Sequence, residues 1–131
     1  MITRWQDCTS FEGEAMGRLT THVLDTAQGK PGAGIAVTLY RVDGGRRRIA
    51  TAITNADGRC DSPLLDGEEF AAGVYEIVFG VGEYYARSGN TLPEPPFLGE
   101  VILRFGVAAP EQHYHVPLLV SPWSYSTYRG S

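Results

Sequence analysis

The sequence predicts an all-β fold, a β-sandwich of short strands with one short helix. The first observation behind this prediction is the spacing of turn residues. The 131 residues include 16 glycines and 8 prolines, and no run longer than twelve residues lacks both. Such spacing leaves little room for a long helix. The second observation is that the segments between turns alternate apolar and polar side chains and are rich in β-branched residues, which is typical of half-buried strands.

The first half of the chain is expected to contain three strands, at residues 18–24, 35–42 and 47–54. Each is followed by residues that favour turns: Lys30-Pro31-Gly32, Asp43-Gly44-Gly45 and Asn55-Ala56-Asp57-Gly58. A short edge strand is then expected at residues 59–62, before Pro63.

The second half of the chain also consists of short strand-like segments separated by turns. Four further strands are expected, at residues 74–79, 99–105, 113–120 and 124–129. Residues 82–88 form the one stretch that suits a short helix, of about two turns. Three prolines make residues 92–96 an irregular connection. Seven or eight short strands at this spacing indicate a single sandwich domain without repeats.

The charge balance excludes several classes of partner. Eleven basic and fifteen acidic side chains give a net charge of −4, which provides no attraction to nucleic acid or to an anionic membrane. We expect residues 1–15 to be a loose extension and residues 16–131 to form the domain. No signal peptide or membrane span is visible, so a cytoplasmic location is expected. Cys8 and Cys60 lack the spacing of a zinc or redox motif and are expected to be free thiols.

The histidines are the first candidates for chemistry. His113 and His115 lie two residues apart on an expected strand, so their side chains point to one face of the sheet, while Tyr114 and Val116 point to the other. Spacing alone favours an exposed polar face or a structural histidine in a subunit contact. A zinc site is a further alternative, with His22 as the third ligand, but no carboxylate or cysteine motif supports it.

The last residues are the second candidate. Tyr128, Arg129 and Ser131 bring a phenol, a guanidinium and a hydroxyl close to the terminal carboxylate, after an apolar, strand-like run. Chain ends are usually disordered unless they are docked. Because this end carries aromatic and polar groups directly after a strand-like run, we expect the tail to be held against the fold and to belong to a site. Arg59, directly after a turn, would ordinarily be a solvated charge. No phosphate loop, nucleophile elbow or paired-carboxylate motif is present, and periodicity alone leaves the function open.

Four motifs together resemble one family. They are Gly17-Arg18-Leu19-Thr20-Thr21-His22-Val23-Leu24-Asp25, Thr54-Asn55-Ala56-Asp57-Gly58-Arg59, His113-Tyr114-His115-Val116-Pro117-Leu118-Leu119 and Tyr128-Arg129-Gly130-Ser131. The combination is similar to the 5-hydroxyisourate hydrolases, the transthyretin-related proteins of urate breakdown. The resemblance covers residues 16–131, and the terminal tetrapeptide together with the histidine-bearing motifs makes it specific.

The resemblance implies a transthyretin-like sandwich of two four-stranded sheets with one short helix. It also implies a homotetramer, a dimer of dimers whose active clefts lie where the dimers meet, and a reaction that needs no metal and no cofactor. That reaction opens the six-membered ring of 5-hydroxyisourate to give 2-oxo-4-hydroxy-4-carboxy-5-ureidoimidazoline. Carried over by motif, the catalytic residues are His22, Arg59 and His115, and the substrate-binding residues are Tyr128, Arg129 and Ser131, with His113 as a possible addition.

These residue types suit the implied reaction. Water must attack a ring carbonyl, and a neutral imidazole of His22 or His115 is a natural base near neutral pH. The guanidinium of Arg59 supplies fixed positive charge for the oxyanion. Arg129 is expected to anchor either the tail or the substrate, and Ser131 to orient the ring rather than to act as a nucleophile. The main alternative is a transthyretin-like carrier of a small ligand without catalysis.

Overall fold

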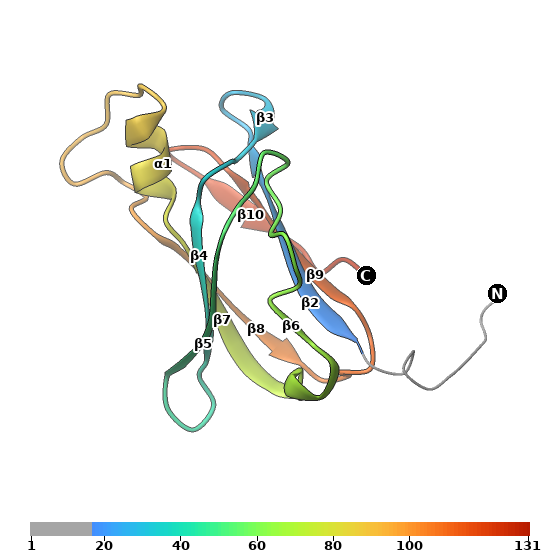
Figure 1. Cartoon of the computed structure of the whole chain (residues 1–131). Coiled ribbons are helices and arrows are strands. Elements are labelled where there is room, and N and C mark those ends of the chain that lie inside the picture. Colours follow the sequence, from blue (N-terminus) through green and yellow to red (C-terminus); the bar gives the residue numbers. More distant parts are fainter. Residues whose placement is uncertain (1–16) are drawn as a thin grey trace.

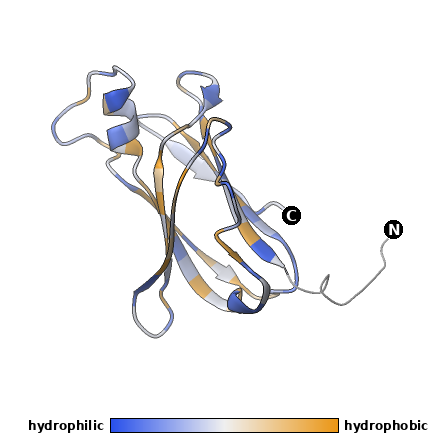
Figure 2. Cartoon of the chain, in the orientation of Figure 1, coloured by the Kyte–Doolittle hydropathy of each residue, from blue (hydrophilic) through white to orange (hydrophobic). Residues whose placement is uncertain are grey.

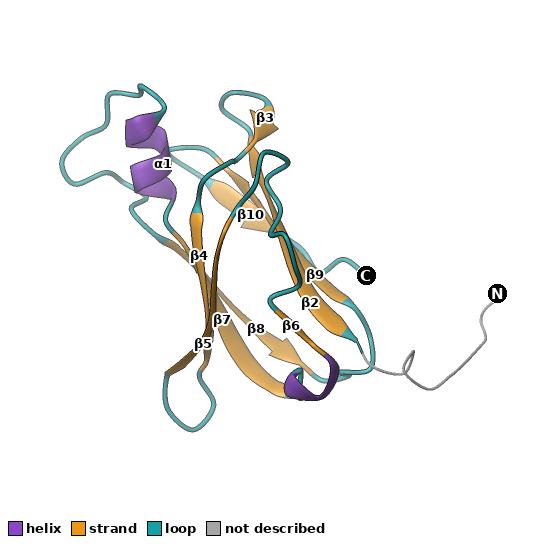
Figure 3. Cartoon of the chain, in the orientation of Figure 1, coloured by secondary structure: helices purple, strands orange, loops and turns teal. Residues whose placement is uncertain are grey.

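Two β-sheets lie face to face in the structure, a computed structural model that describes residues 17–131 (Figures 1 and 3). The expected all-β sandwich with one short helix is therefore confirmed. The expected loose extension at residues 1–15 and the thiol of Cys8 lie outside the described residues.

The first sheet has five strands. They are β2 (Arg18–Asp25), β3 (Lys30–Pro31), β6 (Leu65–Asp66), β9 (Tyr114–Val120) and β10 (Tyr125–Thr127). Their order is β10-β9-β2-β3, and β6 pairs with the start of β2. The central pair, β2 and β9, is parallel, with Leu19 opposite Tyr114 and Asp25 opposite Val120. All other pairs in this sheet are antiparallel.

The second sheet has four antiparallel strands. They are β4 (Ala36–Arg41), β5 (Arg47–Ile53), β7 (Gly73–Phe79) and β8 (Val101–Val107), in the order β5-β4-β7-β8. The strands correspond to the segments expected at residues 35–42, 47–54, 74–79 and 99–105, with shifts of one or two residues at the ends.

The core lies between the sheets. Leu19, Val23 and Leu118 from the first sheet form one buried cluster with Leu39 and Ile77 from the second, and all five are fully buried. Burying such a side chain stabilises the fold by about 1.5–3 kcal/mol. Figure 2 shows the hydrophobic stretches along the strands of both sheets. Since side chains alternate along a strand, this burial turns the residues between them toward the outer faces.

Helix α1 (Val81–Arg87) confirms the helix expected at residues 82–88. It lies at one end of the sandwich, and the short 3-10 helix η2 (Gly67–Glu69) lies at the other (Figure 1). The buried carboxylate of Asp25, at the end of β2, accepts hydrogen bonds from the hydroxyls of Tyr84 at 2.7 Å and Tyr85 at 2.8 Å. These bonds fix the helix to the central strand of the first sheet.

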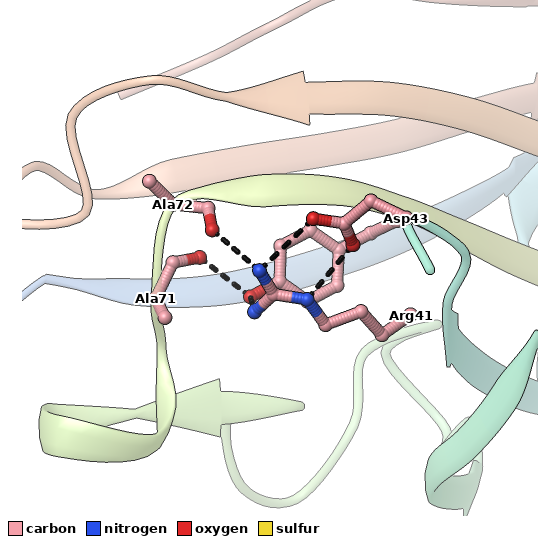
Figure 4. Close-up of polar contacts among 5 residues, drawn as sticks. Arg41, Asp43, Ala71 and Ala72 are labelled. Atoms are coloured by element: carbon pink, nitrogen blue, oxygen red, sulfur yellow. Dashed lines mark hydrogen bonds and ion pairs between the residues drawn. The ribbon is translucent and has the colours of Figure 1, made fainter. Parts of the chain in front are cut away.

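A polar network holds the end of the second sheet (Figure 4). The guanidinium of Arg41 donates to both carboxylate oxygens of Asp43, at 2.8 and 3.1 Å, and to the carbonyl oxygen of Ala72 at 2.7 Å. The hydroxyl of Tyr75 donates to the carbonyl oxygen of Ala71 at 2.6 Å. The network ties the end of β4 to the segment that enters β7, so the connection before β7 has a fixed path.

Three expectations about the first sheet need correction. Residues 59–62 do not form a strand: Arg59 makes a single bridge to His22, and the pairing with β2 resumes only at β6. Lys30–Pro31, expected in a turn, pair with β2 as β3. Because β3 and β6 both join it, the first sheet has five strands instead of four.

The last strand is also shorter than expected, ending at Thr127 instead of residue 129. If the pairing continued, residue 128 would lie opposite Pro117, which has no N–H to donate to it. The hydroxyl of Thr127 donates instead to the Pro117 carbonyl oxygen at 2.6 Å. The pairing returns where β9 again offers a donor: His115 N–H donates to Gly130 at 3.1 Å, and Gly130 N–H donates to the His115 carbonyl oxygen at 2.7 Å. The tail is therefore held against the fold, as expected.

Candidate active site

A pocket of about 410 Å³ lies beside β2, next to the segment between Gly58 and Leu64. The N–H of Val23 donates to the Gly58 carbonyl oxygen at 2.8 Å, and the N–H of Leu64 donates to the Leu19 carbonyl oxygen at 2.8 Å. Between these two bonds, Arg59 alone bridges β2, at His22, and residues 59–63 form one wall of the pocket. The lining residues are Arg18, Thr20, Thr21, Arg59, Cys60, Asp61, Ser62, Pro63, His113, His115 and Ser131.

His115 enters this pocket from the outer face of β9. In the parallel pairing it lies opposite Thr20, and its Nδ1 is 2.8 Å from the hydroxyl oxygen of Thr20. On its other side, backbone hydrogen bonds join it to Gly130. Partial burial lowers the pKa of His115, and the charges of Arg59 and His22 lower it further. The imidazole is therefore neutral at neutral pH and able to accept a proton.

His22 lies two residues after Thr20 on β2, on the same outer face. Its Nε2 is 2.9 Å from the carbonyl oxygen of Asp57. Because a carbonyl oxygen only accepts, Nε2 of His22 carries the hydrogen and is occupied by this bond. The ring centroids of His22 and His115 are 6.4 Å apart, with an angle of 42° between the rings. The two histidines are thus neighbours, although His22 is not among the lining residues of the pocket.

The turn before the pocket wall positions Arg59. The side-chain oxygen of Asn55 accepts from the backbone N–H groups of Asp57 at 2.9 Å and Arg59 at 3.2 Å, and the Asn55 N–H donates to the Arg59 carbonyl oxygen at 2.7 Å. Arg59 is exposed and lines the pocket. Its guanidinium gives the pocket a fixed positive charge next to His115.

His113 and Ser131 line the same pocket as His115. His113 precedes β9 and is exposed. Partial burial and the nearby charge of Arg18 lower the pKa of His113. The expectation that His113 and His115 point to one side of the sheet agrees with their shared pocket, since Tyr114 between them is buried in the core.

Tyr128 and Arg129 lie elsewhere. Both line a separate groove of about 430 Å³ beside β8. The guanidinium of Arg129 donates to the Gln112 side-chain oxygen at 2.9 Å and to the His113 carbonyl oxygen at 3.0 Å, and it lies 4.2 Å from the ring centroid of Tyr114. Of the two roles expected for Arg129, anchoring the tail is the one these contacts serve. Substrate binding by Tyr128 and Arg129 stays a prediction.

Sequence reasoning missed three residues of this region, namely Thr20, Asn55 and Gln112. Thr20 carried a usable signal, because it lies two residues before His22 and so shares its strand face. Asn55 and Gln112 carried no such signal, because their roles are hydrogen bonds to Arg59 and Arg129 that only the folded chain reveals.

Three further observations concern alternatives. Within residues 17–131 the structure has no group of three or more histidine, cysteine or acidic side chains that could hold a metal ion. The same part of the chain contains no helix that is long and apolar enough to cross a membrane. The thiol of Cys60 is free, and burial raises its pKa, with a further increase from Asp61.

Comparisons with known proteins agree with this architecture. The profile of the HIUase/transthyretin family matches residues 19–130. The 5-hydroxyisourate hydrolase of Pseudomonas aeruginosa is 62% identical over 119 residues, which cover 90% of this chain and 94% of that protein. The structure of (S)-allantoin synthase is similar at a TM-score of 0.84 and 47% identity, over 88% of this chain but only 44% of that one. Sea bream transthyretin, solved in complex with thyroxine, has a TM-score of 0.77 at 31% identity, over 86% of this chain and 94% of its own.

Proposed function

This chain belongs to the HIUase/transthyretin family, and on that premise we propose that it is a 5-hydroxyisourate hydrolase. The reaction opens the six-membered ring of 5-hydroxyisourate and gives 2-oxo-4-hydroxy-4-carboxy-5-ureidoimidazoline. The observation that carries the proposal is one pocket lined by His115, Arg59 and Ser131, with the ring of His22 6.4 Å from that of His115. The 62% identity to a named hydrolase supports the same conclusion.

We assign water activation to His115. Its lowered pKa keeps the imidazole neutral, and none of the hydrogen bonds within residues 17–131 involves its Nε2. Nε2 of His22, in contrast, is occupied by the Asp57 carbonyl oxygen. Nε2 of His115 removes a proton from water as the water oxygen attacks the ring carbonyl. When the ring C–N bond breaks, Nε2 gives that proton to the departing nitrogen.

Arg59 stabilises the charge that this attack creates. The carbonyl oxygen becomes an oxyanion, and the exposed guanidinium beside the pocket offers charge-assisted hydrogen bonds to it. The hydroxyl of Ser131 is a hydrogen-bonding group for the substrate ring, and Arg129 keeps the tail in place through Gln112 and the His113 carbonyl oxygen. His22 holds the segment that carries Arg59, through its bridge to Arg59 and its contact with the Asp57 carbonyl oxygen.

We also propose that the active form is a homotetramer, a dimer of dimers. Large apolar side chains are exposed near the edge strands β8 and β10: Phe97, Ile102, Trp123, Tyr125 and Tyr128. Phe97 and Trp123 stack on each other with ring centroids 5.7 Å apart. Clustered exposed apolar groups are typical of protein interfaces. Light scattering coupled to size-exclusion chromatography measures the assembly, and a monomeric mass would refute this part of the proposal. The cytoplasmic location stays a prediction.

The test of the proposed function generates 5-hydroxyisourate from urate with urate oxidase and follows its ultraviolet decay with and without this protein. We expect saturable acceleration that survives treatment with a metal chelator. His115→Ala should lower kcat by about a hundredfold or more, the range of general-base catalysis, with the assembly unchanged. His113→Ala is the matched comparison, because His113 lines the same pocket but is not assigned the proton transfer.

Three results would contradict the assignment. Loss of activity on chelation would restore the zinc hypothesis. Equal losses in the two histidine variants would remove the special role of His115. Decay at the spontaneous rate with a folded protein would favour a carrier, which the 31% identity to sea bream transthyretin, itself solved with thyroxine, makes the second candidate. Binding of thyroxine measured by calorimetry would then be the next experiment.

A further inference from the structure

We propose that Thr20 is a positioning residue for His115: its hydroxyl oxygen accepts the hydrogen of Nδ1 and so leaves Nε2 bare for proton transfer. This inference rests on the proposed hydrolase function. It concerns a residue that the resemblance to known hydrolases did not include in the site, and it arises from the pairing of two strands that are distant in the sequence.

The contact is set by the sheet. Thr20 on β2 and His115 on β9 are direct partners in the parallel ladder, and Thr20 Oγ1 lies 2.8 Å from His115 Nδ1. The neighbouring Thr21 points to the other side, where its hydroxyl donates to the Val116 carbonyl oxygen at 2.7 Å. Because threonine is β-branched, its side chain has few rotamers on a strand. The position of the Thr20 hydroxyl is therefore fixed by the backbone pairing.

The other edge of the imidazole faces the tail. A methyl group built on Gly130 would lie 3.5 Å from His115 Cδ2, so the tail backbone packs along the carbon edge of the ring while Thr20 meets the nitrogen edge. A ring flip would bring a carbon to the Thr20 oxygen and remove the hydrogen bond. The two flanks together specify one ring orientation.

The chemistry decides which atom donates. A neutral imidazole has one N–H, and a threonine hydroxyl can either donate or accept. If Thr20 donated to Nδ1, the hydrogen of His115 would be on Nε2, and that nitrogen could not take a proton from water. When Nε2 does take a proton, both ring nitrogens become donors, and the 2.8 Å contact stays favourable only if Thr20 accepts. A Thr20 hydroxyl that accepts is therefore compatible with both the neutral and the protonated form of His115 in the reaction.

The charged groups around this contact determine which measurement reports on Thr20. Arg59 and His22 act on His115 through their charges, and Arg18 and His113 line the same pocket. Thr20 carries no charge, so replacing its hydroxyl leaves this set of charges unchanged. The tautomer of His115, measured from the ¹⁵N chemical shifts of its ring, reports directly on the proposed role and does not require turnover.

The experiment compares Thr20→Val, which keeps the shape but removes the hydroxyl, with Thr20→Ser, which keeps the hydroxyl. Thr51→Val, at an exposed position of β5, is the matched control. In the unmodified protein we expect the Nδ1–H tautomer of His115. In Thr20→Val we expect this tautomer to lose its majority and kcat to fall roughly tenfold with little change in KM, the lower end of the effect seen for groups that orient a metal-ligating imidazole. Thr20→Ser should restore both, and Thr51→Val should change neither.

Two results would overturn the inference: a majority of the Nε2–H tautomer in the unmodified protein, or a Thr20→Val protein with an unchanged tautomer. If the unmodified protein failed to hydrolyse 5-hydroxyisourate, the proposed function would fall. The ¹⁵N measurement would still decide whether Thr20 fixes the tautomer.

Discussion

Gly130→Ala is the substitution that most directly tests the contact between the tail and His115. Gly130 and His115 exchange two backbone hydrogen bonds, of 3.1 and 2.7 Å. A Cβ atom on residue 130 would lie 3.3 Å from His115 Cβ and 3.5 Å from its Cδ2 and its carbonyl oxygen. The backbone of Gly130 is not in the left-handed region, so alanine is conformationally acceptable there. The new methyl group therefore acts by displacing either the tail or the imidazole.

The expected size of the effect follows from this approach. Carbon atoms in contact prefer about 3.5–4.0 Å, so one side must move by a few tenths of an ångström, for which we take the middle of the range, roughly 0.3–0.5 Å. Misplacing a catalytic group by 1 Å can cost about a hundredfold in rate. If the loss in activation free energy is proportional to the displacement, kcat/KM should fall about four- to tenfold. Stability should change little, because replacing glycine by alanine also restricts the unfolded chain, which offsets a small strain.

The assay is the decay of 5-hydroxyisourate, with thermal unfolding measured in parallel. Gly99→Ala is the matched control, because a Cβ atom there would meet nothing within 4 Å and its backbone is not in the left-handed region either. Full activity in Gly130→Ala, or equal losses in both variants, would refute the view that the tail packs against the catalytic imidazole. A large loss of stability in Gly130→Ala alone would contradict the expectation that the added methyl group causes only a small strain.

Two further predictions concern charge and stability. The pKa of His115 is lower than its ordinary value mainly because of partial burial, and the charge of Arg59 is the next largest cause. In Arg59→Gln that pKa should rise, so the acidic decline of kcat/KM should move to higher pH. An unshifted pH profile would argue against His115 as the base. Asp25→Ala removes an acceptor of the buried Tyr84 hydroxyl at 2.7 Å, of the Tyr85 hydroxyl at 2.8 Å and of the backbone N–H groups of Ala27 and Gln28. Each buried donor left without a partner costs about 1–3 kcal/mol, measurable by urea unfolding. The loss should exceed that of Tyr84→Phe, which leaves no orphaned hydroxyl.

Much of the fold was predictable because burial of one face is a local signal. Leu19 and Val23 alternate with polar residues in the sequence, and they are fully buried in the structure. The same signal located the strands of the second sheet. It failed for β3 and β6, since strands of two residues are defined by the partner they meet and not by their own composition. It failed also at the end of β10, where the missing N–H of Pro117 on the opposite strand ends the ladder.

From strand periodicity alone, without the family resemblance, the site was predictable only where residues are close in sequence. The shared face of His113 and His115 follows from strand alternation, and their shared pocket agrees with it. The separation of Arg129 from that pocket was not predictable. Continuing the β10 register places Arg129 opposite Val116, whose side chain points into the core, and its guanidinium lies over Tyr114. Alternation within the tail alone gives no such information, because the register depends on β9.

The parallel pairing of β2 and β9 connects the stability of the fold to the geometry of the site. The inward side chains of these two strands, such as Val23 and Leu118, are fully buried, while their outward side chains include Thr20, His22 and His115. A shift of one residue in this pairing would separate Thr20 from His115 and would also move core side chains to the outer face. The hydrophobic core therefore resists the register change that would destroy the site. For this reason two residues 95 positions apart in the sequence can hold a 2.8 Å contact without a local motif.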